Sequence, residues 1–310
     1  MSFPTICVVG SANLDLNTYV DRFPAPGETI HGRKFTTGYG GKGANQAVMA
    51  ARLGGAVTLV ARISSDLFGR DMVEHFRKER IDTRYLTPTD GTSTGTAVIT
   101  IDAAGRNTIV VTPGANGLLT AADVESSRTA IETVGVLVCQ QEVPAEANLA
   151  AMRIAADAGV PIIYNPAPVG EGMPQEAYRL ATVLCPNEHE AALLTGQSVQ
   201  TQAEAESAAR ELLNRGPRSV VLTLGERGCL VVTGQAVTAI PAPRVQAVDT
   251  TGAGDAFIGS LAFFLARGSD LASAAQRATQ IAAISVQLPG TQTSFPRAAE
   301  LPALLREESV

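Results

Sequence analysis

The alternation of apolar runs and amphipathic segments along the chain predicts an α/β fold. Thr5–Val9 is a short, continuous apolar run that ends at Gly10, and similar runs recur at 57–63, 134–139, 160–164 and 219–224. Such runs indicate strands that are buried on both faces of a sheet. Helical patterns alternate with them, at 145–158, 203–215, 255–267 and 271–286. Repeated strand–helix–strand units predict a single domain, residues 1–310, with a mostly parallel central sheet between two layers of helices.

Two stretches do not fit this alternation and predict a second, smaller sheet. The first, about 14–37, has β-prone residues on both sides of the break at Phe23-Pro24-Ala25-Pro26-Gly27. The second, about 95–112, contains two apolar runs around Ala103-Ala104-Gly105-Arg106, which is typical of a hairpin. An isolated small sheet cannot bury both of its faces. We therefore expect it to act as a lid over a site, to pair with another subunit, or to do both.

Composition and charge narrow the class of partner. The 310-residue chain has a net charge of −6 and no block of Lys or Arg, which argues against a nucleic-acid surface. The longest markedly apolar run, 256–266, is too short to cross a bilayer, and the start Met1-Ser2-Phe3-Pro4 lacks a basic signal-like segment. We expect a cytoplasmic protein without membrane contact that binds small molecules. The four cysteines stand singly in apolar runs and predict buried free thiols, and the three scattered histidines predict surface or packing roles.

The stretch Asp249-Thr250-Thr251-Gly252-Ala253-Gly254-Asp255-Ala256-Phe257 joins a polar segment to an apolar helical run. Small residues at the start of a helix bring bare N–H groups and the helix dipole close to an anion such as a phosphate. A carboxylate in such a place, Asp255, has a role if a hydroxyl beside the phosphate must lose its proton. A turn in which Asp255 only caps the helix explains the same residues equally well.

Gly38, Gly40 and Gly43 match the G-x-G-x-x-G fingerprint of dinucleotide sites, with Asp66 at about the expected distance. The segment before them, 35–37, is short and polar, whereas the fingerprint belongs after the first buried strand. Lys42 also lacks the following Ser or Thr of a phosphate-binding P-loop. We interpret the segment as a second pocket wall, in which glycines bring N–H groups close to a sugar and Lys42 and Asn45 supply donors.

Polar residues follow several of the predicted strands, and the carboxyl ends of parallel strands meet at one edge of a sheet. They are Asn13, Asp15, Glu142, Asn165, Asn187, Glu190, Thr223 and Gly225. Taken alone, Asn13 and Asp15 favour a simple turn after the first strand. Glu188 and Glu190 fit as dipole partners in a first helical turn. Glu190 with Asn187 also suits Mg²⁺, which keeps several of its waters.

Three stretches occur in order over nearly the whole chain and resemble signatures of the ribokinase-like carbohydrate kinases. They are Gly40-Gly41-Lys42-Gly43-Ala44-Asn45-Gln46, Pro186-Asn187-Glu188-His189-Glu190, and the segment 249–257. The resemblance implies a three-layer α/β/α core with a β lid. It also implies ATP-dependent phosphorylation of D-ribose at its 5-hydroxyl, with Mg²⁺ and K⁺, in a homodimer formed through the lid.

The resemblance also implies roles for individual residues. Asp255 would be the general base, and Gly252, Ala253 and Gly254 would form an anion hole. The sugar would be held by Asn13, Asp15, Gly41, Lys42, Gly43, Asn45, Glu142 and Asp255. ATP would be bordered by Asn187, Thr223, Gly225, Gly228, Gly254 and Thr279, and Glu190 would act near Mg²⁺. The K⁺ positions would be Asp249, Thr251, Ser285, Leu288, Gly290 and Ser294. Thr279 stands where the family often has His or Asn, so we expect no hydrogen bond to adenine there.

Several alternatives remain at this point. The tail 290–296 is similar to that of deoxyribokinases, whereas the amide of Asn13 favours a sugar that has a 2-hydroxyl. Kinases of other furanose sugars also fit. A nicotinamide-dependent dehydrogenase is suggested by Gly38, Gly40 and Gly43 but gives Asp255 no task. A non-catalytic sugar-binding protein would have no need of the base.

Overall fold

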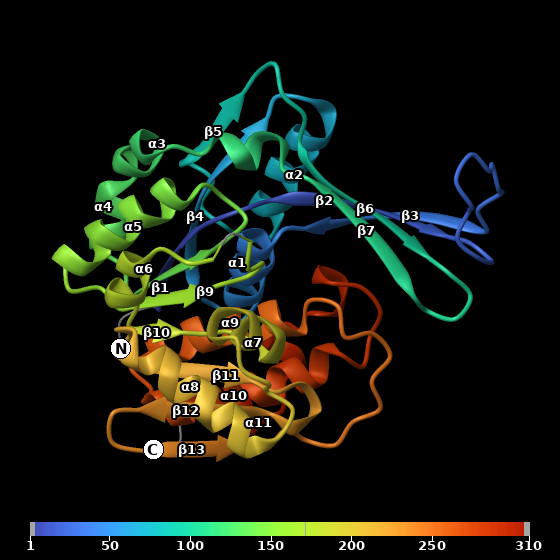
Figure 1. Cartoon of the computed structure of the whole chain (residues 1–310). Helices are drawn as coiled ribbons and strands as arrows, with labels where there is room; N and C mark the ends of the chain where they lie inside the picture. The colour runs from blue at the N-terminus through green and yellow to red at the C-terminus, as the bar shows by residue number, and fades with distance from the viewer. Residues whose placement is uncertain (1–3, 171, 307–310) are drawn as a thin grey trace.

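The computed structural model describes residues 4–170 and 172–306, and it has the predicted three-layer α/β architecture (Figure 1). The strands of the main sheet are β1 (Thr5–Val9), β4 (Ala56–Ser64), β5 (Leu86–Thr89), β8 (Val136–Gln140), β9 (Ile162–Asn165), β10 (Val183–Leu184), β11 (Ser219–Thr223), β12 (Cys229–Thr233) and β13 (Val237–Ile240). Their order is β13-β12-β11-β10-β9-β8-β1-β4-β5. The pairs from β11 to β5 are parallel, whereas β12 and β13 pair antiparallel at one edge.

Both faces of this sheet are covered, which explains the continuous apolar runs. The helices are α1 (Lys42–Arg52), α2 (Leu67–Lys78), α3 (Ala121–Ser126), α4 (Arg128–Glu132), α5 (Ala145–Asp157), α6 (Gln175–Leu180), α7 (Glu188–Thr195), α8 (Gln202–Asn214), α9 (Ala253–Ala266), α10 (Leu271–Ser285) and α11 (Ala303–Arg306). Ile6 and Val8 of β1 pack into the core under α1, α2, α9 and α10, and Cys7 and Val9 pack into the core under α3, α5 and α8. Alternate residues of one strand thus supply two cores.

Helix α9 lies in the middle of its layer, and every side chain from Asp255 to Phe264 is buried. A helix that is apolar around its whole circumference belongs in the interior of a protein. At Gly259 a Cβ would stand 2.5 Å from the backbone oxygen of Gln46, so glycine allows α1 to approach α9 closely. This approach places the first turn of α1 beside the first turn of α9.

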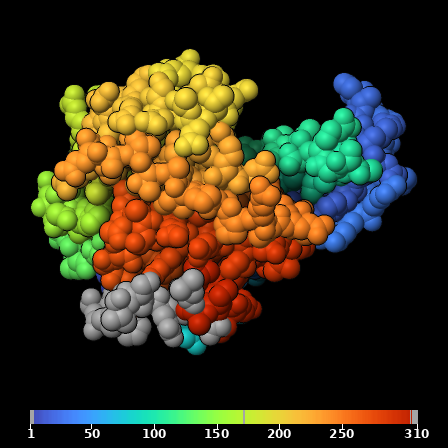
Figure 2. Space-filling model, turned by 90° about the horizontal axis from the view of Figure 1, so that it is seen from below, coloured from blue at the N-terminus to red at the C-terminus, as the bar shows by residue number. Residues whose placement is uncertain are grey.

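The predicted second sheet is present and has the order β3-β2-β6-β7. Its strands are β2 (Asn13–Tyr19), β3 (Lys34–Gly40), β6 (Gly95–Ile101) and β7 (Asn107–Thr112). It projects beyond the main body of the molecule (Figures 1 and 2). Every residue of β7 is exposed. Gly38 and Gly40 lie in β3 of this sheet, so the fingerprint does not follow a buried strand of the main sheet, as expected.

The remaining expectations about the chain can be compared with the described residues. All four cysteines are buried and free. No helix within residues 4–170 and 172–306 is long and apolar enough to span a membrane. The first three residues, on which the expectation of no signal segment partly rests, lie outside the described residues. The apolar pattern did not indicate β5 or β13, and it placed the start of α9 two residues late.

Candidate active site

The carboxylate of Asp255 is buried in the first turn of α9 and is 7% exposed. Its Oδ2 accepts a hydrogen bond of 2.9 Å from Nδ2 of Asn45, and its Oδ1 accepts one of 2.9 Å from Nε2 of Gln46. Both donors belong to α1. The N-cap of α9 is Gly252, and no side chain caps this helix. The alternative in which Asp255 only caps the helix is therefore wrong.

The start of α9 has the form that an anion site requires. Gly252 has a φ of 78°, and a Cβ there would stand 2.5 Å from Cγ2 of Thr291, so glycine is needed for both conformation and space. A Cβ at Gly254 would have no atom within 4 Å, because this residue borders open space. The first N–H groups of the helix and its dipole therefore border a cavity.

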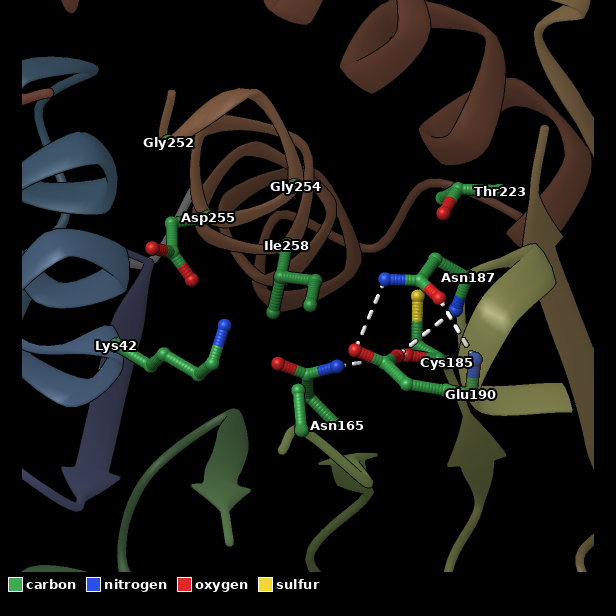
Figure 3. Close-up of a pocket in the computed structure, with 11 residues that line it drawn as sticks. Lys42, Asn165, Cys185, Asn187, Glu190, Thr223, Gly252, Gly254, Asp255 and Ile258 are labelled. Atoms are coloured by element: carbon green, nitrogen blue, oxygen red, sulfur yellow. Dashed lines mark hydrogen bonds between the residues drawn. The ribbon is translucent and has the colours of Figure 1, made fainter. Parts of the chain in front are cut away.

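This cavity, of about 160 Å³, is shown in Figure 3. It is lined by Lys42, Asn165, Ala167, Cys185, Asn187, Glu190, Thr223, Gly252, Gly254, Asp255 and Ile258. The Lys42 side chain extends from α1 toward the centre of the cavity. Burial alone would lower the pKa of Lys42, but the carboxylates of Asp255, Glu142 and Glu190 outweigh it and raise the pKa. Lys42 is therefore a fixed positive charge beside Asp255.

A second, larger cavity of about 1010 Å³ adjoins the first. It borders all six residues predicted to contact ATP: Asn187, Thr223, Gly225, Gly228, Gly254 and Thr279. Asn187, Thr223 and Gly254 line both cavities, so the two spaces meet at these residues. The Thr279 hydroxyl donates to the backbone oxygen of Ala275 at 2.8 Å, within its own helix.

The glycine-rich segment before α1 packs against the end of β1. A Cβ at Gly43 would stand 2.6 Å from the backbone nitrogen of Ser11, so this close approach requires glycine. The N–H of Lys42 donates to Oε2 of Glu142 at 2.9 Å, and the N–H of Gly43 donates to the Ser11 hydroxyl. These two N–H groups thus bind protein atoms, whereas the sequence suggested that they face a sugar. Gly41, with a φ of 86°, makes the turn into the helix.

Asn13 and Asp15 begin β2, at the foot of the small sheet. The side-chain oxygen of Asn13 accepts a hydrogen bond of 2.7 Å from Nδ2 of Asn116, so the amide NH₂ of Asn13 is left for a ligand. Burial, followed by the charges of Glu142 and Asp255, raises the pKa of Asp15 to about 7. Glu142 and Asp255 thus lie close enough to Asp15 for their charges to raise its pKa.

Glu190 and Asn187 form a capping box at the start of α7. The Glu190 carboxylate accepts from the backbone N–H and from Nδ2 of Asn187, each at 2.9 Å, and Oδ1 of Asn187 accepts from the Glu190 N–H at 2.8 Å. Burial and then the charge of Asp255 raise the pKa of Glu190, against the opposing effects of Asn187 and Lys42. Glu188 instead pairs with Arg227 at the surface. A single carboxylate that lines the smaller cavity fits Mg²⁺, which binds through few protein ligands.

The segments predicted for K⁺ lie together beside the start of α9. Oδ1 of Asp249 accepts from the Thr251 N–H at 2.9 Å and Oδ2 from the Gly290 N–H at 2.8 Å. Although burial alone would raise it, these hydrogen bonds hold the pKa of Asp249 below its usual value. The Ser285 and Ser294 hydroxyls donate to backbone oxygens of their own turns. The N–H of Leu288 donates to the backbone oxygen of Ser285. One ionised carboxylate among backbone and hydroxyl oxygens is a donor set that suits a monovalent cation.

Three residues around the site were not assigned from the sequence. Gln46 donates to Asp255, Gln292 donates from Nε2 to Oδ1 of Asn45 at 2.9 Å, and Asn116 holds Asn13. Gln46 and Gln292 stand inside stretches that the resemblance had marked, the glycine-rich segment and the tail, so a signal existed for them. Asn116 lies in the short helix η1 (Gly114–Leu118), and nothing in the local sequence indicates its role.

Comparisons with known proteins agree with this geometry. The model of the pfkB family carbohydrate kinases matches residues 4–298. The chain is 42% identical to a ribokinase of Mus musculus over 305 residues, which cover 97% of this chain and 94% of the relative. It is 36% identical to a deoxyribokinase of Salmonella typhi over 291 residues, which cover 94% and 95%. The structure of Arabidopsis thaliana ribokinase complexed with ribose and ATP superposes with a TM-score of 0.91 at 29% identity, covering 99% of this chain and 100% of that one.

The family match spans nearly the whole chain, and the relatives match over nearly their whole lengths. A dehydrogenase is excluded as the class of this protein by this match and by the position of Gly38 and Gly40 in the small sheet. On the evidence of its fold, its paired cavities and these comparisons, the chain belongs to the pfkB family of carbohydrate kinases.

Proposed function

We propose that this protein transfers the γ-phosphoryl group of ATP to the 5-hydroxyl of D-ribose. The observation that carries the proposal is the junction of the two cavities at Asn187, Thr223 and Gly254, with Asp255 on the smaller side. A nucleotide in the larger cavity would place its terminal phosphate at the start of α9. The 42% identity to a ribokinase and the fold shared with a ribose and ATP complex support ribose and ATP as the ligands.

In this proposal Asp255 takes the proton from the sugar hydroxyl. Asn45 and Gln46 each donate one hydrogen bond to its carboxylate, and each carboxylate oxygen has a second lone pair that remains available. The two donors hold the carboxylate in one orientation, so the hydroxyl oxygen and the phosphate can meet in line.

Lys42 and the N–H group of Gly254 supply positive potential where negative charge develops during transfer, whereas the N–H of Ala253 donates to the backbone oxygen of Thr250 at 3.2 Å. Lys42 stays protonated because three carboxylates surround it. Donors that are fixed in place before the reaction stabilise such charge at no cost in reorganisation. The buried walls of the smaller cavity, among them Ile258 and Ala167, limit the access of water to the phosphoryl group.

The cations belong to the proposal as well. Glu190 would hold Mg²⁺ through its waters, and the ion, when bound, would neutralise charge on the phosphate oxygens. Asp249 with Thr251, Ser285, Leu288, Gly290 and Ser294 would hold K⁺. Turnover should fall on removal of Mg²⁺ and rise on replacing Na⁺ with K⁺. Equal rates in the two monovalent salts would contradict the K⁺ site.

Asp255→Asn tests the central claim, with Asp157→Asn as the control. Asp157 is an exposed residue at the end of α5 and lines neither cavity. Loss of the base should lower kcat by about 10²- to 10⁴-fold, while ribose binding measured by calorimetry persists. The control variant should turn over like the unchanged protein. A kcat within tenfold of normal in Asp255→Asn would overturn the mechanism, and persistent binding without any turnover in the unchanged protein would favour a sugar-binding protein.

Sugar choice is tested by ADP release with ribose, 2-deoxyribose and fructose. The free NH₂ of Asn13 suits a sugar hydroxyl, and a binding site built to pair with a hydroxyl discriminates against the sugar that lacks it. We therefore expect a higher kcat/KM for ribose than for 2-deoxyribose. The reverse order would indicate the activity named in the Salmonella typhi relative.

The small sheet is proposed as a lid, discontinuous in sequence over about 14–37 and 95–112, that also pairs with the lid of a second copy. Its exposed apolar side chains are Phe35, Val98, Ile109, Val110 and Val111. Phe35, Val98 and Val110 lie on one face of this sheet, and Ile109 and Val111 lie on the other, because successive residues of a strand alternate between faces. Exposed apolar side chains that gather on one face are typical of association surfaces. Light scattering should give a dimer that Val110→Lys dissociates, and a monomer at working concentrations would refute the pairing. A cytoplasmic location, where ATP is abundant, fits this activity, and cell fractionation measures it.

A further inference from the structure

Asn45, which donates to Asp255, is itself held by a chain of hydrogen bonds. Its Oδ1 accepts from Nε2 of Gln292 at 2.9 Å, and Oε1 of Gln292 lies 2.7 Å from Nε2 of His75. The His75 ring stacks on Tyr39 of β3, with ring centroids 3.9 Å apart. Asn45 and Gln292 are each 4% exposed. The chain thus runs from the small sheet, through α2 and the C-terminal tail, to the catalytic carboxylate.

The direction of every hydrogen bond in this chain follows from chemistry. An ionised carboxylate only accepts hydrogen bonds, so Asn45 must turn its NH₂ toward Asp255 and its oxygen away. That oxygen needs a donor, which is the NH₂ of Gln292. The oxygen of Gln292 then needs a donor in turn, and Nε2–H of His75 supplies it. Each group therefore holds the next one in a single orientation.

The backbone of Gln292 is fixed independently of its side chain. Nη1 of Arg52 donates to the backbone oxygens of Gln292 and Phe295. The guanidinium of Arg52 also pairs at 2.7 Å with Glu79, the residue that follows α2, and both side chains are nearly buried. A substitution in the side chain of Gln292 therefore leaves the anchoring of the tail in place.

The other donor to Asp255 has a comparable support. Oε1 of Gln46 accepts from Nε2 of Gln140 at 2.8 Å, and Gln140 ends β8 in the main sheet. Gln46 is thus oriented by the rigid sheet. Asn45 is oriented by a tail residue that is 247 positions away in sequence.

We propose that Gln292 and His75 are positioning residues of the phosphoryl transfer, which set the orientation of Asn45 and through it that of Asp255. The inference rests on the proposed role of Asp255 as the base. Neither residue needs to contact the sugar or ATP. Their effect should therefore fall on kcat and spare the KM for ATP.

Gln292→Glu is the sharpest test because it keeps size and shape, removes the donor and adds a negative charge. A carboxylate at this position cannot donate to Oδ1 of Asn45, so the amide of Asn45 turns over and presents its oxygen to Asp255. We expect kcat to fall by about 10- to 100-fold, as for small misplacements of reacting groups, with an unchanged KM for ATP. Gln235→Glu, on the exposed turn between β12 and β13, is the charge-matched control and should leave kcat unchanged.

His75 provides a second, independent pair of variants. His75→Phe keeps an aromatic ring against Tyr39 and removes the donor. In His75→Gln, the side-chain NH₂ of the glutamine can donate in place of Nε2–H of the histidine. We expect His75→Phe to lower kcat by about 3- to 10-fold, less than Gln292→Glu because the donor is one link further from Asp255. We expect His75→Gln to restore most of the loss. A purely structural role for the ring predicts the opposite order.

The outcomes separate this inference from the proposed function. A normal kcat in Gln292→Glu, or an equal loss in both His75 variants, overturns the positioning role even if Asp255→Asn is inactive. Normal turnover in Asp255→Asn overturns the proposed function itself. Circular dichroism and the melting temperature monitor folding, and if Gln292→Glu does not fold, the order of the two His75 variants decides.

Discussion

Substitution of Asp15 by asparagine should make the stability of the ligand-free protein less dependent on pH. Burial, then Glu142 and Asp255, raises the pKa of Asp15 to about 7. Among the described residues, no donor hydrogen-bonds its carboxylate, which lies against Gly40, where a Cβ would stand 2.4 Å from Oδ1. The folded protein thus disfavours the charged form of Asp15. The asparagine side chain has the same shape and carries no charge, so the folded protein has no charged form to disfavour at this position.

The sign follows from proton binding in the two states. The unfolded chain releases the Asp15 proton near pH 4 and the folded chain near pH 7, so between these values the folded state holds more protons. The contribution of Asp15 to stability is complete below pH 4 and is lost as the pH rises toward 7. A difference of about 3 units at about 1.4 kcal/mol each gives a ceiling of ~4 kcal/mol. Because solvent reaches part of the carboxylate, we expect about 2 kcal/mol.

Urea unfolding of the unchanged protein and of Asp15→Asn, at about pH 5 and pH 8, measures this difference. From pH 5 to pH 8, the free energy of unfolding of Asp15→Asn should rise by about 1 to 2 kcal/mol relative to that of the unchanged protein. Asp157→Asn, at an exposed position, should show no such gain. A variant that differs from the unchanged protein by the same amount at both pH values would refute the raised pKa. Saturating ribose should shrink the gain if its hydroxyls donate to Asp15.

Three further substitutions test the packing around the site by urea unfolding. Asn116→Ala removes three hydrogen bonds to Ala12 and Asn13 and should lower the free energy of unfolding by about 2 to 4 kcal/mol. It should also raise the KM for the sugar, and an unchanged KM would mean that Asn13 needs no support from Asn116. Gly43→Ala places a Cβ against backbone and should cost about 3 kcal/mol or more, whereas Gly234→Ala, in open space, should be nearly neutral. Arg52→Met leaves the buried Glu79 with Arg297 as its remaining guanidinium partner and removes two hydrogen bonds to the tail backbone, and it should cost about 3 kcal/mol. Arg210→Met, in an exposed pair, should cost less than about 1 kcal/mol, and equal costs would contradict the role of burial.

Much of the fold could be predicted because its signals are local. A strand buried on both faces, such as β1, needs a continuous apolar run, and a hairpin such as β6–β7 needs a turn between two such runs. β7 ends at Thr112, which is where the predicted second stretch, about 95–112, ends. The sequence predicted less where a strand forms only because it pairs with a neighbouring strand. Short edge strands such as β5 and β13 form because a neighbouring strand is there to accept their hydrogen bonds.

Part of the candidate site could likewise be predicted from the sequence, and part of it could not. The residues predicted to border ATP do gather on one cavity. Asn187, Thr223 and Gly225 lie there because the carboxyl ends of parallel strands converge, whereas Gly254 and Thr279 come from α9 and α10. The glycine-rich segment did not meet its expectation in detail, because the N–H groups of Lys42 and Gly43 bind Glu142 and Ser11. Which partner an N–H group finds depends on the packing of α1 against β1, and no local pattern records it.

By itself, the sequence determined the alternation of strands and helices, the glycines at the start of α9 and the carboxylate that follows them, because backbone preference and spacing act over a few residues. Only the tertiary structure decided which groups orient that carboxylate. Asn45 lies 210 positions from Asp255, and Gln292 lies 247 positions from Asn45. These side chains meet because Gly259 lets α1 approach α9 and because Arg52 holds the tail, and hydrogen bonds at 2.9 Å require such packing before they can form.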